Sequence, residues 1–183
     1  MRTIPGMTVI NPSDGVSAKK LLEQAVAMEG PCYVRLGRAK VPVFYEDSDQ
    51  LTLGRGNLVR DGKDVTIVAT GIMVSEAMAA AEKLKEDGID ARIIDIHTIK
   101  PIDEEILIKA AQETGAIVTA EEHSIIGGLG SAVAEVIVKN CPVKMAMVGQ
   151  KDTYGESGKP DELKKKYGMT AEDIEAAVKN LIG

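Results

Sequence analysis

The stretch AIVTAEEHSIIGGLGSAVAEVIV, residues 116–138, constrains the fold more than any other part of the sequence. It opens with an apolar run, Ala116 to Ala120, which has the length and composition of a strand buried on both faces. Glycines at 127, 128 and 130 then permit a sharp turn and a close approach to neighbouring backbone. Apolar residues recur after them at helical spacing. The stretch therefore predicts a strand, a tight turn and a helix.

Segments of strand and helix character alternate around this stretch. The expected strands are 65–70, 91–96, 116–120 and 143–148, and the other expected helices are 74–86, 103–113, 160–167 and one that follows a capping box at 170–173. Short connections between such segments indicate a parallel sheet covered by helices on both faces. We expect a mostly parallel, helix-covered α/β domain.

The N-terminal segment predicts a smaller unit of the same type. Met7 to Ile10 is a short strand, a helix follows the Asn-Pro-Ser-Asp turn and ends near Met28, and Cys32 to Leu36 is a second strand. One βαβ unit cannot bury both faces of two strands, so we expect it to rest on the larger domain or on a second copy of the chain. From Gly37 to Gly62 the periodicity fades, which indicates a linker with a short antiparallel edge strand at 57–60.

Composition excludes several classes of function. The formal net charge is −6 and the chain holds one Phe and four Tyr, so it has neither a basic stripe nor many aromatics for nucleic acid. Because no apolar run approaches the roughly 20 residues that span a bilayer, we expect no membrane segment and a soluble, cytoplasmic protein. Cys32 and Cys141 lie far apart, and we interpret them as small buried residues rather than disulfide or zinc ligands.

The glycine-rich turn partly resembles a dinucleotide-binding fingerprint. Val133 occupies the position of the third glycine, and the turn follows the third strand of its domain instead of the first. We therefore favour close packing of a helix on a sheet, or of one subunit on another, over nucleotide binding.

Two histidines and three serines are the candidates for catalytic groups. His123 follows two glutamates and could act as a base or a metal ligand, but neither it nor His97 has a partner at ligand spacing. We interpret both as structural or surface hydrogen-bonding residues. Serine catalysis is not expected, because no His/Asp pattern or nucleophile elbow accompanies the three serines considered, namely Ser124, Ser131 and Ser157.

Arg35 and Arg38 lie where the Cys32 strand ends, at the edge of a parallel sheet where ligands bind. A guanidinium suits phosphate because its donors are planar and permanently charged. Position alone leaves two alternatives open, a phosphate contact and a surface ion pair.

Three stretches together resemble the C-terminal part of a transketolase. They are MRTIPGMTVINPSDGVSAKKLLEQAVAMEGPCYVRLGR, EEHSIIGGLGSAVAE and DTYGESGKPDELKKKYGMTAEDI, and the resemblance runs over essentially the whole chain. It implies a remnant of the thiamine diphosphate pyrimidine-binding domain at 1–46, a linker at 47–57 and a transketolase C-terminal domain at 58–183. The relatives 1-deoxyxylulose 5-phosphate synthase and the 2-oxo acid dehydrogenase beta subunits share the second stretch in looser form.

The resemblance implies two-carbon ketol transfer between sugar phosphates, with thiamine diphosphate and a divalent metal, Mg or Ca, in the complete enzyme. Arg38 matches the arginine that binds the sugar phosphate in this family, by its place before Lys40-Val41-Pro42. No Gly-Asp-Gly motif occurs, and the activating glutamate of the family would lie upstream of Met1, which looks like an internal methionine of the family pattern.

We therefore expect this section alone to be inactive and to bind no cofactor tightly. Its expected partners are the N-terminal, diphosphate-binding part of a transketolase, a second copy of itself and sugar phosphates. Two other hypotheses stay open at this point, an autonomous α/β dimerisation module and an unrelated nucleotide-binding oxidoreductase.

Overall fold

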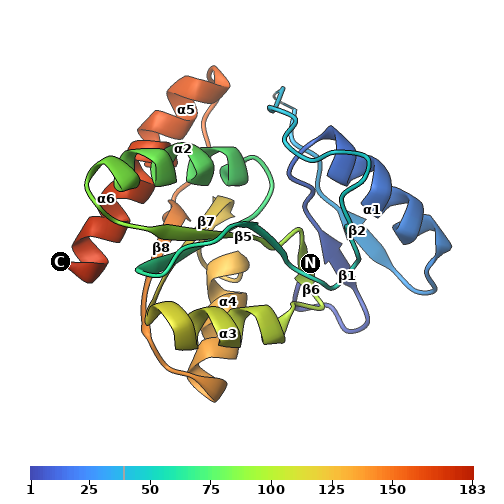
Figure 1. Cartoon of the computed structure of the whole chain (residues 1–183). Helices are drawn as coiled ribbons and strands as arrows, with labels where there is room; N and C mark the ends of the chain where they lie inside the picture. The colour runs from blue at the N-terminus through green and yellow to red at the C-terminus, as the bar shows by residue number, and fades with distance from the viewer. Residues whose placement is uncertain (39) are drawn as a thin grey trace.

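The computed structural model describes residues 1–38 and 40–183 and shows two α/β units that lie side by side (Figure 1). The larger unit contains a five-stranded sheet in the order β3-β5-β4-β7-β8. Its strands are β3 (Asn57–Arg60), β4 (Val65–Ala69), β5 (Ala91–Asp95), β7 (Ala116–Ser124) and β8 (Lys144–Gln150). All of them pair in parallel except β3, which lies antiparallel to β5 at the sheet edge. The predicted α/β fold and its antiparallel edge strand are confirmed.

Helices cover both faces of this sheet (Figure 1). On one face lie α2 (Met73–Glu86) and α6 (Ala171–Ile182), and on the other lie α3 (Glu104–Thr114) and α4 (Leu129–Asn140). Alternation along β4 divides the core, because Ile67 packs under α2 and α6 whereas Val68 packs under α3 and α4. The short helix α5 (Pro160–Lys166) precedes α6, whose N-cap Thr170 forms the predicted capping box with Asp173.

The smaller unit is the predicted βαβ segment, formed by β1 (Thr8–Ile10), α1 (Gly15–Ala27) and β2 (Cys32–Val34). Strands β1 and β2 are parallel. The third strand of this sheet is β6 (Thr98–Lys100), which belongs to the chain of the larger unit and pairs antiparallel with β1. Of the two alternatives left open, the larger domain and a second copy of the chain, the structure shows the first, and the strand that the small unit borrows was not predicted.

Side chains reinforce this junction. The guanidinium of Arg2 binds both carboxylate oxygens of Glu135 on α4, at 2.9 and 2.6 Å. Lys100 Nζ donates to the carbonyl oxygens of Arg2 and Ile4, at 3.1 and 2.6 Å. Each unit therefore contributes charged groups that satisfy polar atoms of the other.

Two details differ from expectation. The strand expected to end at Ala120 continues to Ser124, because Glu121 is buried and lies within the sheet. Cys32 and Cys141 are free but only partly buried, since one lies on an edge strand and the other caps the end of α4. Within the described ranges, no helix has the length and apolar character needed to cross a membrane.

Candidate functional site

The glycine-rich turn places the N-terminus of α4 over a carboxylate of the chain itself. The backbone N–H groups of Leu129 and Gly130 donate to Glu121, at 2.7 and 2.8 Å. A Cβ atom on Gly128 would lie 1.9 Å from Oε2 of Glu121, so a side chain at this position would displace the carboxylate. Glu121 occupies the place that a pyrophosphate would take in a dinucleotide-binding turn. The geometry supports close packing over nucleotide binding.

Burial governs the chemistry of Glu121. It is 1% exposed, and burial raises the pKa of its carboxyl, although the two backbone N–H groups, His123 and Arg35 act in the opposite direction. An anion at a helix N-terminus is stabilised by the unpaired N–H groups and the helix dipole. Sequence analysis missed this residue, but the three glycines before and within α4 signal amide groups that need an acceptor.

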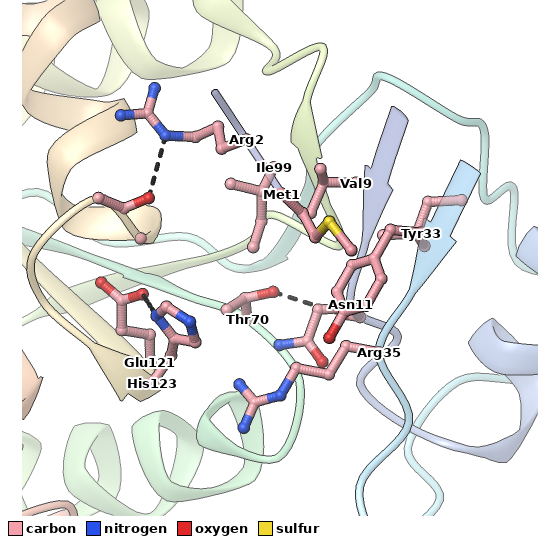
Figure 2. A pocket seen from close by; sticks show the side chains of 13 residues that line it. Met1, Arg2, Val9, Asn11, Tyr33, Arg35, Thr70, Ile99, Glu121 and His123 are labelled. Carbon is pink, nitrogen blue, oxygen red and sulfur yellow. Dashed lines mark hydrogen bonds and ion pairs between the residues drawn. The ribbon is translucent and has the colours of Figure 1, made fainter. Parts of the chain in front are cut away.

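The carboxyl ends of β4 and β7 form the topological switch point of the larger sheet, because the chain leaves β4 toward β5 on one side and returns to β7 on the other. A cavity of about 110 Å³ lies there, between the two units. We call it the interdomain cavity (Figure 2). Its lining comprises Met1, Arg2, Val9, Ile10, Asn11, Tyr33, Arg35, Thr70, Ile99, Glu121, His123, Gly127 and Gly128.

A second cavity, of about 270 Å³, is lined in part by Arg38, and we call it the Arg38 cavity. Its lining comprises Asn11, Pro12, Ser13, Asp14, Gly15, Ala18, Arg35, Leu36, Gly37, Arg38, Val41, Ile72 and Glu122. Arg38 is exposed, whereas Arg35 is partly buried and lies 3.8 Å from the carboxylate of Glu122. The structure thus brings the two predicted arginines to one cavity. For Arg35 it shows a long ion pair with Glu122, which was one of the two alternatives stated for these arginines.

The histidines divide into a buried and an exposed residue. His97 is fully buried, with Nδ1 2.9 Å from Oγ1 of Thr98 and Nε2 3.2 Å from Oδ1 of Asn57. Burial lowers the pKa of His97 to about 4, so the ring is neutral and structural. His123 is half exposed, and its Nδ1 lies 2.9 Å from the carbonyl oxygen of Ser124. Both observations agree with the structural and surface roles predicted for them.

A pair of buried aspartates joins the linker to both units. Oδ2 of Asp95, at the end of β5, accepts from the hydroxyls of Ser13 and Tyr45, at 2.6 and 3.0 Å. Asp14 caps α1 by accepting from Ser17 N–H at 2.8 Å, and its other oxygen accepts from the N–H groups of Phe44 and Tyr45. We call this group the aspartate clasp. It was not predicted, because its members are far apart in sequence and only the N-cap role of Asp14 has a local signal.

Burial sets the protonation of the clasp. It raises the pKa of Asp95 to about 7, against the opposing effect of the Ser13 and Tyr45 hydroxyls. Burial also acts to raise the pKa of Asp14, but hydrogen bonds from Ser17, Tyr45 and Phe44 outweigh it and leave the pKa below its ordinary value. Below about pH 7 the Asp95 carboxyl therefore keeps its proton, whereas the Asp14 carboxyl stays charged down to a pKa below its ordinary value.

The residues present do not by themselves fit thiamine diphosphate and its metal. No Gly-Asp-Gly motif occurs in the sequence, and among residues 1–38 and 40–183 no three His, Cys, Asp or Glu side chains form a metal-binding group. The chain thus has an exposed arginine at a cavity but lacks, among these residues, the ligand set for a metal-bound diphosphate.

Comparisons with known proteins agree with this geometry. The family model for the transketolase pyrimidine-binding domain matches residues 1–43, and the model for the transketolase C-terminal domain matches residues 54–174. The 6-deoxy-6-sulfo-D-fructose transketolase subunit SqwH of Clostridium sp. (strain MSTE9) is 50% identical over 95% of this chain. An apulose-4-phosphate transketolase subunit of Phocaeicola vulgatus is 43% identical over 95% of the chain.

The chain spans 54% and 56% of the lengths of these two curated relatives. A solved structure described as the inactive beta4 tetramer of a split-gene transketolase matches all of this chain with a TM-score of 0.96 and 48% identity, over 60% of its own length. One family model alone covers 121 of the 183 residues (54–174). The chain therefore belongs to the transketolase family and corresponds to its C-terminal section.

Proposed function

We propose that this chain supplies the sugar-binding arginine and the assembly surfaces of a thiamine diphosphate-dependent transketolase. The parts that hold the cofactor's diphosphate and metal then come from the N-terminal section of such an enzyme, as a partner. The complete assembly transfers a two-carbon ketol unit between sugars, and this section alone is inactive. The observation that carries the proposal is Arg38 at the edge of a cavity of about 270 Å³, in the segment that follows β2.

The substrates we propose are sugars that end in an oxyanion. The relatives from Clostridium and Phocaeicola are named for a 6-deoxy-6-sulfo sugar and a 4-phosphate sugar, each with such a group. An arginine guanidinium binds sulfonate or phosphate oxygens through parallel, charge-assisted hydrogen bonds. Arg35 adds a second positive charge to the same cavity, partly balanced by Glu122.

An activity assay tests this proposal. The chain is assayed for ketol transfer alone and mixed with the N-terminal section of a transketolase, with thiamine diphosphate and Mg²⁺, on phosphorylated, sulfonated and neutral ketoses. We expect turnover only in the mixture. Arg38→Met should lower kcat/KM for the anionic sugars about tenfold or more, since one charge-assisted contact contributes roughly 1.5–3 kcal/mol. The neutral sugar should be affected little.

The matched control is Arg60→Met, which removes an arginine that pairs with Glu82 at the far edge of the larger sheet. It should leave every rate unchanged. Turnover by the chain alone, or an equal loss on anionic and neutral sugars in Arg38→Met, would contradict the proposal.

We also propose that the chain associates with copies of itself. The structural relative is described as a beta4 tetramer, and the small unit exposes apolar side chains that a lone chain would leave in water. The exposed apolar residues of this unit and the linker are Met1, Ile4, Leu22, Val26, Leu36 and Val43. Analytical ultracentrifugation without thiamine diphosphate should show an oligomer, and a monomer at micromolar concentration would refute self-association.

A further inference from the structure

The interdomain cavity lies where the carboxyl ends of strands from both sheets meet, which is where α/β proteins bind ligands. Asn11 and Tyr33 come from the ends of β1 and β2, and Thr70 and His123 come from the ends of β4 and β7 (Figure 2). The cavity is therefore assembled from two units that are far apart along the chain. Nothing in the sequence indicates it locally.

Asn11 is held rigidly at this place. Its N–H donates to the carbonyl oxygen of His97 at 2.8 Å, and its own carbonyl oxygen accepts from Oγ1 of Thr70 at 3.3 Å. Its side-chain amide packs so closely on Gly71 that a Cβ there would lie 2.6 Å from Nδ2. The residue is only 8% exposed and lines both cavities, yet its amide forms no hydrogen bond with any other described residue. Because the residue lines the cavity and its amide is unpaired, the amide can donate to or accept from a ligand there.

Three further polar side chains line the same space. The Tyr33 hydroxyl and Nε2 of His123 make no hydrogen bond within the described part of the chain, and Arg35 reaches Glu122 only at 3.8 Å. In Figure 2 the Arg35 side chain extends toward Glu121 and His123. The amide, the phenol and the guanidinium come from the smaller unit and supply donors for an oxyanion, and the imidazole of the larger unit supplies an acceptor for a hydroxyl.

Glu121 restricts the charge of that ligand. Its buried carboxylate lines the cavity and accepts two backbone N–H groups, so it has lone pairs left for a ligand hydroxyl but disfavours a dianion. Apolar side chains of Val9, Ile10 and Ile99 line part of the cavity and suit a carbon frame.

We propose that the interdomain cavity is a binding site for a small hydroxylated carboxylate, distinct from the Arg38 cavity. Arg35 and the Asn11 amide bind the carboxylate, Tyr33 donates to it or to a hydroxyl, and Nε2 of His123 and Glu121 accept from hydroxyls, because Nδ1 of His123 donates to the Ser124 carbonyl oxygen. The site joins the two units, so its ligand also stabilises their junction. The proposal goes beyond the proposed transferase and does not depend on it.

NMR titration of the whole ¹⁵N-labelled chain with D-glycerate tests the proposal, with glycerol as the uncharged control and inorganic phosphate as the dianion. We expect saturable shifts of the Asn11 side-chain amide with glycerate, none with glycerol, and weaker binding of phosphate at pH 8. Arg35→Met should weaken glycerate binding about tenfold or more, and Tyr33→Phe severalfold.

Arg38→Met is the matched control, because Arg38 lines only the other cavity. It should leave glycerate binding within about twofold of the parent while lowering kcat/KM for the anionic sugars about tenfold or more, which separates the two proposals. Circular dichroism verifies that each variant is folded. No saturable shift at Asn11, shifts equal with glycerol, or an equal loss in Tyr33→Phe and Arg38→Met would overturn the site.

Discussion

The two sheets of this molecule differ in completeness. The five-stranded sheet has helices on both faces, and residues such as Ile67 and Val68 at its centre are fully buried. The small sheet has three strands of three residues each, and one of them is lent by the larger unit. Its strand β2 is only partly buried throughout. The difference teaches that the larger unit can fold by itself, whereas the smaller one is stable only where it touches the larger.

The strongest test of this comparison removes core volume from each unit. Ile67→Ala in β4 should lower the free energy of global unfolding by about 2–5 kcal/mol, because a fully buried side chain is replaced by a cavity. Ile10→Ala in β1, equally buried, should mainly reduce amide protection of the small unit. Urea unfolding with hydrogen exchange measures both. Val138→Ala, at a 68% exposed position on α4, is the control. Equal loss of protection in both units would show that they unfold together.

Two glycines of the turn at the boundary between the units test how tightly that boundary is packed. Gly128→Ala should destabilise the fold by roughly 1–3 kcal/mol through overpacking, because the new methyl group meets Glu121 and the Ser124 carbonyl. Gly127→Ala is the matched control. It lies at φ +76 with open space around its Cβ position, so only about 1 kcal/mol of backbone strain is expected. Thermal unfolding compares them, and a smaller effect at Gly128 would mean that Glu121 moves away freely.

The pH dependence of stability separates two buried groups at the junction. Asp95 keeps its proton up to a pKa of about 7 in the folded chain against 3.8 as its ordinary value, so its contribution to stability is lost as pH rises from about 4 to 7. His97 has a folded pKa of about 4 against 6.5, so its contribution is lost as pH falls through the same range. The two slopes, each on the order of 1 kcal/mol per pH unit, oppose one another.

Single variants should expose each slope. In Asp95→Asn only the titration of His97 remains of the two effects. The free energy of unfolding should therefore rise with pH between 4 and 6.5 more steeply than in the parent chain. In His97→Gln only the titration of Asp95 remains of the two effects. The free energy of unfolding should therefore fall as pH rises from about 4 to 7. Urea unfolding at several pH values measures the curves, and parallel curves for the two variants would disprove the assignment.

The smallest expected effect concerns the ion pair that ties the N-terminus to α4. Arg2 and Glu135 form a bidentate pair at the surface, and their partly exposed side chains limit its contribution. A double-mutant cycle of Arg2→Met and Glu135→Gln should give a coupling of about 0.5–1 kcal/mol, reduced in 1 M salt. A salt-independent coupling above about 2 kcal/mol would show that the junction is far less solvated than we infer.

The sequence predicted the elements of both units well, because their patterns are local. Apolar runs, the glycine turn and the cap at Thr170 each act within a few residues. The strand β6 was missed because the segment Thr98–Lys100 has no strand pattern of its own and is extended by pairing with β1.

The site was predicted only where a family motif or a strand end marked it. Arg38 and Arg35 were found in this way, and the sugar-binding role of Arg38 stays a prediction. The aspartate clasp depends on the hydrogen bond from Ser13 to Asp95, two residues that are 82 positions apart, and such a contact leaves no pattern in a single sequence. Glu121 accepts from Leu129, which is only 8 positions away. Gly128 and Gly130 were a local sign of the contact between Glu121 and the N-terminus of α4.

The borrowed strand β6 means that the covalent linker is not the only tether between the halves of this protein. A protease nick in the exposed stretch at 46–50 would cut the backbone while the strand pairing, the clasp and the Arg2 contact still hold the fragments together. Such a nicked molecule would migrate as two bands on a denaturing gel and as one species in native chromatography. A gene could therefore be split or fused within this linker without loss of the contacts that hold the two units together.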